Sequence, residues 1–116
     1  MEPKIIDVET RAYQNSDFRR VIQTSKELQL VLMSIPPETD IGMEVHPETT
    51  QFFVIESGSG LAILNGEKYK MGPGDAVWVP SGTAHNIVNI GTIPLKLYTL
   101  YAPPKDAPGL VQANKP

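Results

Sequence analysis

The sequence predicts an all-β fold, and three observations support this prediction. Short runs rich in β-branched and aromatic residues alternate with turn-forming residues along most of the chain. Eleven prolines and nine glycines divide the chain into short segments. Helical periodicity is hard to find, and no crossover helix separates the β-rich runs. These observations favour a β-sandwich or barrel over βαβ units.

Nine segments are expected to be strands: 18–24, 28–34, 42–46, 51–56, 61–65, 67–71, 75–79, 85–90 and 95–101. Turn signals lie between them. The strongest is Asn65-Gly66, because both central residues of a type I′ hairpin turn need a positive φ. Segment 103–116 is rich in proline and polar residues, so we expect an extended or frayed tail.

Length and composition restrict the possible functions. A chain of 116 residues fits one domain, residues 1–116. The net charge of −3 gives no support for nucleic-acid binding, and no apolar run is long enough to predict a membrane span. The first residues lack the basic and apolar regions of a signal peptide, which predicts a cytoplasmic protein. With no cysteine, any bound metal must use histidine, carboxylate, amide or water ligands.

One of the only two histidines lies in a motif with defined spacing, Gly74-x5-Pro80-x-Gly82-x2-His85-x3-Asn89. Pro80 is expected to end a strand, Gly82 to permit a tight reversal, and His85 to open the next strand. The motif resembles the second signature motif of the cupin superfamily at every defining position. We expect Asn89 to be a structural partner on its strand.

The first cupin motif is a histidine pair spaced HxH, followed by a glutamate and then a glycine. Counting back from Gly58 places Gln51 at the glutamate position, His46 at one histidine position and Glu44 at the other. The resemblance covers residues 41–101. It implies a jelly-roll barrel, also called a double-stranded β-helix, in which Glu44, His46, Gln51 and His85 bind a divalent metal ion.

The spacing is also reasonable without the family. Residues i and i+2 of a strand face the same way, so Glu44 and His46 can project into one interior. Gln51 follows on the next strand, and His85 begins another. Two imidazoles, one carboxylate and one amide suit Zn, Fe, Mn or Ni, and would leave coordination positions open for a small oxygenated ligand.

Each of these residues also has an ordinary alternative role. His46 and His85 could be pocket histidines without metal, and Glu44 could be a surface carboxylate. Gln51 could bind only a water molecule. Glu48 competes as the carboxylate ligand, although Pro47 and the adjoining threonines predict a turn that directs Glu48 to solvent.

The strand pattern also predicts the surroundings of the site. If Gln51 points inward, Phe53 does as well, since the two residues are separated by one strand period. Phe53, Met33 and either Tyr98 or Tyr101 would then line an apolar pocket around the metal.

The resemblance implies a metal-dependent enzyme of the oxygenase or isomerase type, acting on a small oxygenated substrate, with Glu44 also able to act as a general base. Two alternatives remain open. One is a ligand-binding cupin without turnover. The other is a metal-free epimerase-type cupin, which needs a histidine–carboxylate base and an opposed tyrosine, Tyr98 or Tyr101.

Two further expectations concern the ligand and the partner. The cations near the motifs are Lys68, Lys70 and Lys96, and the first two are expected to face solvent. Phosphorylated sugars therefore rank below uncharged or carboxylate-bearing substrates. A homodimer is also expected, because segments 18–24 and 28–34 would otherwise leave an exposed sheet edge.

Overall fold

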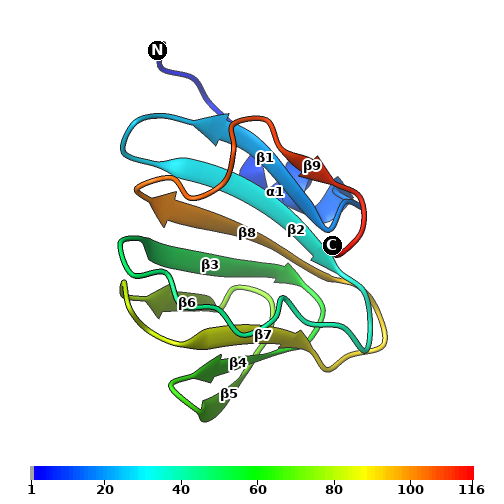
Figure 1. The fold of residues 1–116 in the computed structure, drawn as a ribbon. Helices are drawn as coiled ribbons and strands as arrows, with labels where there is room; N and C mark the ends of the chain where they lie inside the picture. Colours follow the sequence, from blue (N-terminus) through cyan, green and yellow to red (C-terminus); the bar gives the residue numbers. More distant parts are fainter. Residues whose placement is uncertain (1) are drawn as a thin grey trace.

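Two antiparallel sheets make up the body of the molecule (Figure 1). The structure, a computed structural model, describes residues 2–116. The larger sheet has the strand order β6-β3-β8-β2-β1-β9, and the smaller sheet has the order β5-β4-β7. The strands are β1 Arg19–Thr24, β2 Gln29–Ile35, β3 Thr50–Ser57, β4 Gly60–Leu64, β5 Glu67–Met71, β6 Ala76–Val79, β7 His85–Asn89, β8 Leu95–Ala102 and β9 Val111–Gln112. The expected all-β jelly-roll fold is confirmed.

Two short elements lie outside the sequence expectation. Helix α1 spans Val8–Gln14 and packs against β2, β3 and β8. Only Ala12 of this helix is buried, so no apolar periodicity marks it in the sequence. Strand β9 pairs with β1, and the tail is therefore attached to the larger sheet.

The strand expected at 42–46 is wrong. Residues 40–46 make only isolated bridges to β7, Asp40 with Val88 and Glu44 with His85. Between the two bridges Gly42 has a φ of +103°, a left-handed conformation that interrupts an extended strand. The segment is a loop fixed to β7 at two points.

The core lies between the sheets and changes character along their strands. The side chains of Phe53 and Ile55 on β3 and of Leu97 on β8 are essentially fully buried. At the other end, Gln51 pairs in register with Tyr101, and both residues are buried. The interior is therefore apolar around Ile55 and polar around Gln51. Gln51 and Phe53 both point inward, as the strand alternation predicts.

Two local predictions, the Asn65-Gly66 turn and a structural role for Asn89, are confirmed by the backbone and by hydrogen bonds. Asn65 and Gly66 have φ values of 49° and 85°, as the hairpin between β4 and β5 requires. Asn89 is 3% exposed, and its amide donates to the carbonyl oxygens of Ile35 (2.8 Å) and Ile93 (2.9 Å). Its role is structural. Among the described residues, no helix is long and apolar enough to cross a membrane.

Candidate metal centre

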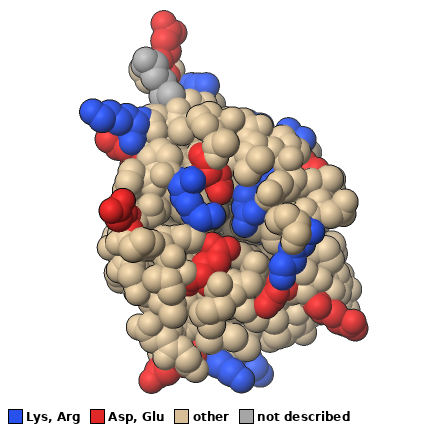
Figure 2. All heavy atoms as spheres, viewed as in Figure 1, with Lys and Arg blue, Asp and Glu red and all other residues tan. Residues whose placement is uncertain are grey.

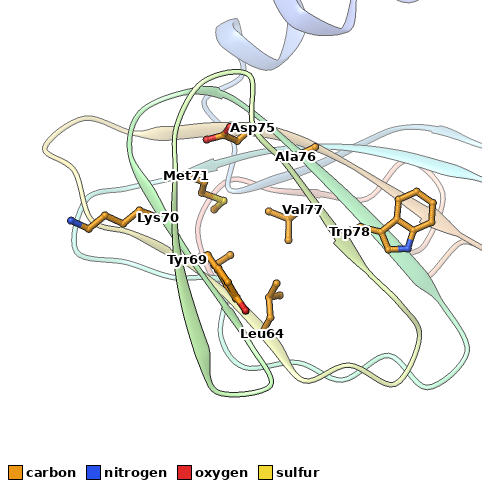
Figure 3. Close-up of a pocket in the computed structure, with 9 residues that line it drawn as sticks. Leu64, Tyr69, Lys70, Met71, Asp75, Ala76, Val77 and Trp78 are labelled. Carbon is orange, nitrogen blue, oxygen red and sulfur yellow. The ribbon is translucent and has the colours of Figure 1, made fainter.

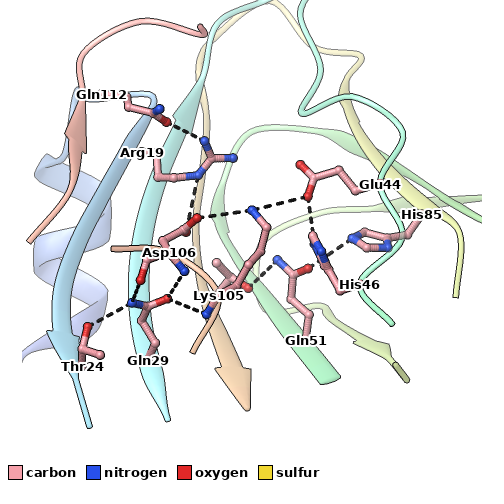
Figure 4. Close-up of polar contacts among 11 residues, drawn as sticks. Arg19, Thr24, Gln29, Glu44, His46, Gln51, His85, Lys105, Asp106 and Gln112 are labelled. Atoms are coloured by element: carbon pink, nitrogen blue, oxygen red, sulfur yellow. Dashed lines mark hydrogen bonds and ion pairs between the residues drawn. The ribbon is translucent and has the colours of Figure 1, made fainter. Parts of the chain in front are cut away.

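Three segments bring Glu44, His46, Gln51 and His85 together; we call these residues the four-residue cluster (Figure 4). Gln51 lies on β3 and His85 begins β7, and each is 2% exposed. Glu44 and His46 lie on the loop between β2 and β3. The loop is held at Glu44, whose backbone N–H donates to the His85 carbonyl oxygen and whose carbonyl accepts from the His85 N–H, both at 2.9 Å.

The contact between His46 and Glu44 is close but is not a hydrogen bond. Nε2 of His46 lies 2.8 Å from Oε2 of Glu44. Nevertheless this buried nitrogen makes no hydrogen bond. Buried polar atoms in native proteins nearly always have a partner, so an orphaned ring nitrogen beside a carboxylate is a feature that a bound cation would explain.

His85 and Gln51 show a similar arrangement. Nδ1 of His85 lies 2.9 Å from the carbonyl oxygen of Thr83, which can only accept, so Nδ1 carries the proton. In a neutral imidazole Nε2 is then an acceptor, and it faces Oε1 of Gln51 at 3.1 Å. The Gln51 amide is oriented by a hydrogen bond from its Nε2 to Oγ1 of Thr99 at 3.0 Å. A cation in this space would satisfy both facing lone pairs.

The donor atoms have a span that suits one ion. Ligand atoms of Glu44, His46 and His85 all lie within 4.8 Å of one another. Two donors at right angles and ~2.1 Å from a common ion are ~3 Å apart, and opposite donors are ~4.2 Å apart. The limit of 4.8 Å in the cluster is slightly above the separation of opposite donors, so small side-chain adjustments would be needed to bind one ion. Two imidazoles, a carboxylate and an amide therefore fit a first-row divalent ion.

Burial shifts the pKa of two groups at this site, His46 and Tyr101. Burial lowers the pKa of His46 below its ordinary value, although the Glu44 carboxylate opposes this shift. A lowered pKa favours the neutral imidazole that a metal requires. Burial, with Asp106 as a further cause, raises the pKa of Tyr101 far above the usual value, so its hydroxyl stays protonated.

The structure also decides between the competing residues. Glu48 is exposed on the turn after Pro47 and does not belong to the cluster. Tyr98 pairs in register with Val54, and the β8 alternation directs its side chain to the face opposite Tyr101. The Tyr101 ring centroid lies 6.0 Å from that of His46, so Tyr101 is the tyrosine at the site.

Three charged residues near the cluster were not predicted from the sequence, namely Arg19, Lys105 and Asp106 (Figure 4). They come from β1 and from the tail, where no motif or periodicity marks them. Because Lys105 contacts Glu44, the assumption that Lys68, Lys70 and Lys96 are the relevant cations is wrong.

The three lysines of that assumption lie elsewhere. Lys68 and Lys70 are exposed on β5. The ammonium of Lys96 donates to the carbonyl oxygen of Asn15, next to α1.

A separate pocket of about 320 Å³ lies against β4, β5 and β6 (Figure 3). It does not include any member of the four-residue cluster. Its lining residues are Ala62, Leu64, Tyr69, Lys70, Met71, Asp75, Ala76, Val77 and Trp78. It offers a mostly apolar wall with few metal-ligating groups, so the candidate metal site is the cluster and not this pocket.

Comparisons with known proteins decide the family. The family model described as "Cupin domain" matches residues 31–101. This chain is a cupin. The uncharacterized protein YrkC of Bacillus subtilis is 38% identical over 98% of this cupin and 64% of its own length, so this chain spans about two thirds of that relative. The uncharacterized protein L612 of Acanthamoeba polyphaga mimivirus is 38% identical over 97% of this cupin and 72% of its own length.

Solved structures agree with this assignment. The crystal structure of BH2720 from Bacillus halodurans has a TM-score of 0.96 and 38% identity, covering 98% of this cupin and 91% of that chain. KdgF from Halomonas sp. has a TM-score of 0.71 and 25% identity, covering 76% and 79% of the two chains. A predicted oxalate decarboxylase from Thermotoga maritima has a TM-score of 0.64 and 25% identity, covering 68% and 69%.

Proposed function

We propose that this protein is a metal-dependent cupin enzyme of the oxygenase or isomerase type, acting on a small oxygenated substrate. Glu44, His46, Gln51 and His85 would hold Zn, Fe, Mn or Ni. The observation that carries this proposal is the convergence of these donors around the buried Nε2 of His46, which has no hydrogen-bond partner. A bound ion would supply Lewis-acid polarisation of a substrate oxygen and, if redox-active, one-electron chemistry.

The surrounding residues have defined tasks in this proposal. The Thr83 carbonyl fixes the tautomer of His85 so that Nε2 faces the ligand space. Phe53, with its ring centroid 6.1 Å from that of His85, forms an apolar wall that limits water. Glu44 has a second carboxylate oxygen beyond the one that contacts His46, and it can accept a proton from a substrate bound beside it.

One resemblance supports a small substrate with a carboxylate, and another gives only weak support to a phosphorylated sugar. The Thermotoga maritima structure is described as a predicted oxalate decarboxylase, and it shares 25% identity with this chain. The matched mannose-1-phosphate guanylyltransferases align with this chain over only 16% of their length, so they give weak support to a phosphorylated sugar.

The metal-free epimerase reading has less support. The contact between His46 and Glu44 is 2.8 Å long, but Nε2 of His46 makes no hydrogen bond, which gives a base dyad less support. The raised pKa of Tyr101 makes its hydroxyl a poor proton donor for catalysis near neutral pH.

The deciding experiment begins with elemental analysis of protein purified without a chelator or a metal-affinity step. Chelated protein is then reconstituted separately with Fe(II), Mn(II), Ni(II) and Zn(II), and oxygen uptake and substrate isomerisation are followed. We expect metal binding at about one ion per chain, lost in His46→Ala and His85→Ala and retained in Glu48→Gln. Turnover by fully chelated protein would contradict the proposal, and tight ligand retention without turnover would favour a binding protein.

We also propose a homodimer, although for a different reason than the sequence suggested. Strand β2 lies inside the larger sheet, and the two-residue strand β9 covers the outer edge of β1 only at Arg19 and Arg20. Strand β6 ends the sheet on the other side and carries Trp78, which is 67% exposed. An open edge with an exposed aromatic residue favours association with a second copy.

A further inference from the structure

The segment after β8 returns to the four-residue cluster and is anchored there. The backbone N–H groups of Lys105 and Asp106 donate to Oε1 of Gln29 at 3.2 and 2.9 Å. Nε2 of Gln29 donates in turn to the carbonyl oxygen of Asp106 at 2.8 Å. Gln29 is fully buried, so these bonds fix the backbone at Lys105 relative to the barrel.

The Lys105 side chain points from this fixed backbone to the cluster (Figure 4). Its ammonium lies 3.8 Å from Oε2 of Glu44, the same oxygen that contacts His46. It also lies 3.3 Å from Oδ1 of Asp106 and 5.7 Å from the Tyr101 ring centroid. The side chain is 31% exposed, so the ammonium can move within this space.

Arg19 is bound to the tail and does not contact the candidate metal ligands. Its Nη1 donates to Oε1 of Gln112 at 2.6 Å, and its Nε lies 3.8 Å from Oδ2 of Asp106. Both side chains of the Arg19–Asp106 pair are 9% exposed. Arg19 therefore positions Asp106, whereas Lys105 is the cation that contacts a candidate metal ligand.

With a divalent metal ion bound, the cluster and its surroundings would carry a net positive charge that favours an anionic ligand. Glu44 and Asp106 carry two negative charges, and Lys105 and Arg19 carry two positive charges, so these side chains balance. Ligating histidines are neutral, and a divalent ion therefore adds two uncompensated positive charges to a partly buried site. Acidic and basic side chains gather in the middle of this face, and further charged side chains lie around its rim (Figure 2).

Metal binding would also change what Lys105 can contact. When Glu44 ligates a dication, its negative charge is largely neutralised and attracts the Lys105 ammonium less. A ligand oxygen at a coordination position next to Glu44 lies ~3 Å from the Glu44 oxygen. That position is within reach of Nζ, which already lies 3.8 Å from the same oxygen.

We propose that Lys105 is the specificity residue that binds the carboxylate of a 2-hydroxy or 2-oxo acid chelated by the metal. The inference rests on the proposed metal site and adds the substrate class and the residue that selects it. A single ammonium suits a carboxylate. A phosphate is commonly held by several donors, and Arg19 is already engaged.

The test compares a charged ligand with its neutral counterpart on cobalt-loaded protein. Co(II) binding is first titrated by visible absorption for wild type, Lys105→Met, Lys105→Arg and the control Lys115→Met. Lys115 pairs with Asp40, which is not a member of the cluster. Each loaded protein is then titrated with lactate and with lactamide, following the cobalt spectrum.

We expect Lys105→Met to bind Co(II) at least as tightly as wild type, because a cation beside Glu44 is removed. Its affinity for lactate should fall roughly tenfold or more, as for loss of a charge-assisted hydrogen bond, while its affinity for lactamide stays unchanged. Lys105→Arg should retain most of the lactate affinity, and Lys115→Met should match wild type.

The outcomes separate the two proposals. Failure of wild-type protein to bind Co(II) would overturn the metal site itself. Cobalt binding with lactate affinity in Lys105→Met within twofold of wild type would overturn only the role of Lys105. An equal loss for lactate and lactamide, or an equal loss in Lys115→Met, would also overturn it, because neither depends on a contact with the carboxylate.

Discussion

Replacing Gln51 by glutamate should change metal affinity and metal-free stability in opposite directions. Gln51 is 2% exposed, and its Oε1 faces Nε2 of His85 at 3.1 Å. In Gln51→Glu a negative oxygen takes the place of a neutral one at the expected ion position. Without metal, the new carboxylate stays buried and cannot donate to Oγ1 of Thr99 as the Gln51 amide does, so the Thr99 hydroxyl would have to turn and donate to it.

The magnitude follows from two opposing terms. Two unit charges 4 Å apart attract by about 4 kcal/mol at an effective dielectric constant of 20, and a dication at ligand distance attracts more strongly. Burying the carboxylate costs several kcal/mol, so we expect a net gain on the order of 1.4–2.8 kcal/mol, about ten- to hundredfold in affinity. The metal-free variant should be less stable by about 2–4 kcal/mol.

Competition with a chromophoric chelator measures the affinity, and thermal melting with and without metal measures the stability. Glu44→Gln provides the reciprocal change and should weaken binding, whereas Glu48→Gln should leave it unchanged. A folded Gln51→Glu protein with unchanged or weaker metal affinity would refute the assignment of Gln51 as a ligand.

Three further predictions concern pH, backbone conformation and assembly. The hydrogen bond from Lys115 lowers the pKa of Asp40. The Asp40 carboxylate therefore contributes to the stability of the fold above about pH 4, and this contribution is lost as the pH falls through the lowered pKa. Acid titration of Asp40→Asn should show a shallower loss of folding stability than that of wild type. Gly58 has a φ of +94°, and an added Cβ would lie 2.9 Å from the Pro94 carbonyl oxygen. Urea unfolding should therefore show Gly58→Ala destabilised by about 1–3 kcal/mol, and the open-space control Gly72→Ala nearly unchanged. Sedimentation at micromolar concentration should show a dimer, and a purely monomeric species would contradict the homodimer.

The parts of the fold that follow from local periodicity could be predicted from the sequence. Alternation along β3 places Gln51 and Phe53 on the inner face, and both are buried. The two-residue spacing of Glu44 and His46 placed both side chains at one site, even though the expected strand there is a loop. Side-chain direction survived because the loop is bridged to β7 at Glu44 itself.

The remaining parts depend on contacts that the sequence does not encode locally. Lys105 and Asp106 reach the cluster because Gln29, more than seventy residues earlier, binds their backbone. No spacing rule connects such distant positions. Helix α1 was missed for a related reason, since a seven-residue helix that buries only Ala12 leaves no periodic signal.

The reciprocal backbone hydrogen bonds between Glu44 and His85 have a kinetic consequence. They tie two proposed ligands from distant parts of the chain through main-chain atoms, which no side-chain substitution removes directly. Much of the entropy cost of fixing these ligand residues is therefore incurred during folding, before an ion binds. The rate of ion exchange should depend on how often this loop detaches from β7, so variants with very different equilibrium affinities can share one opening step.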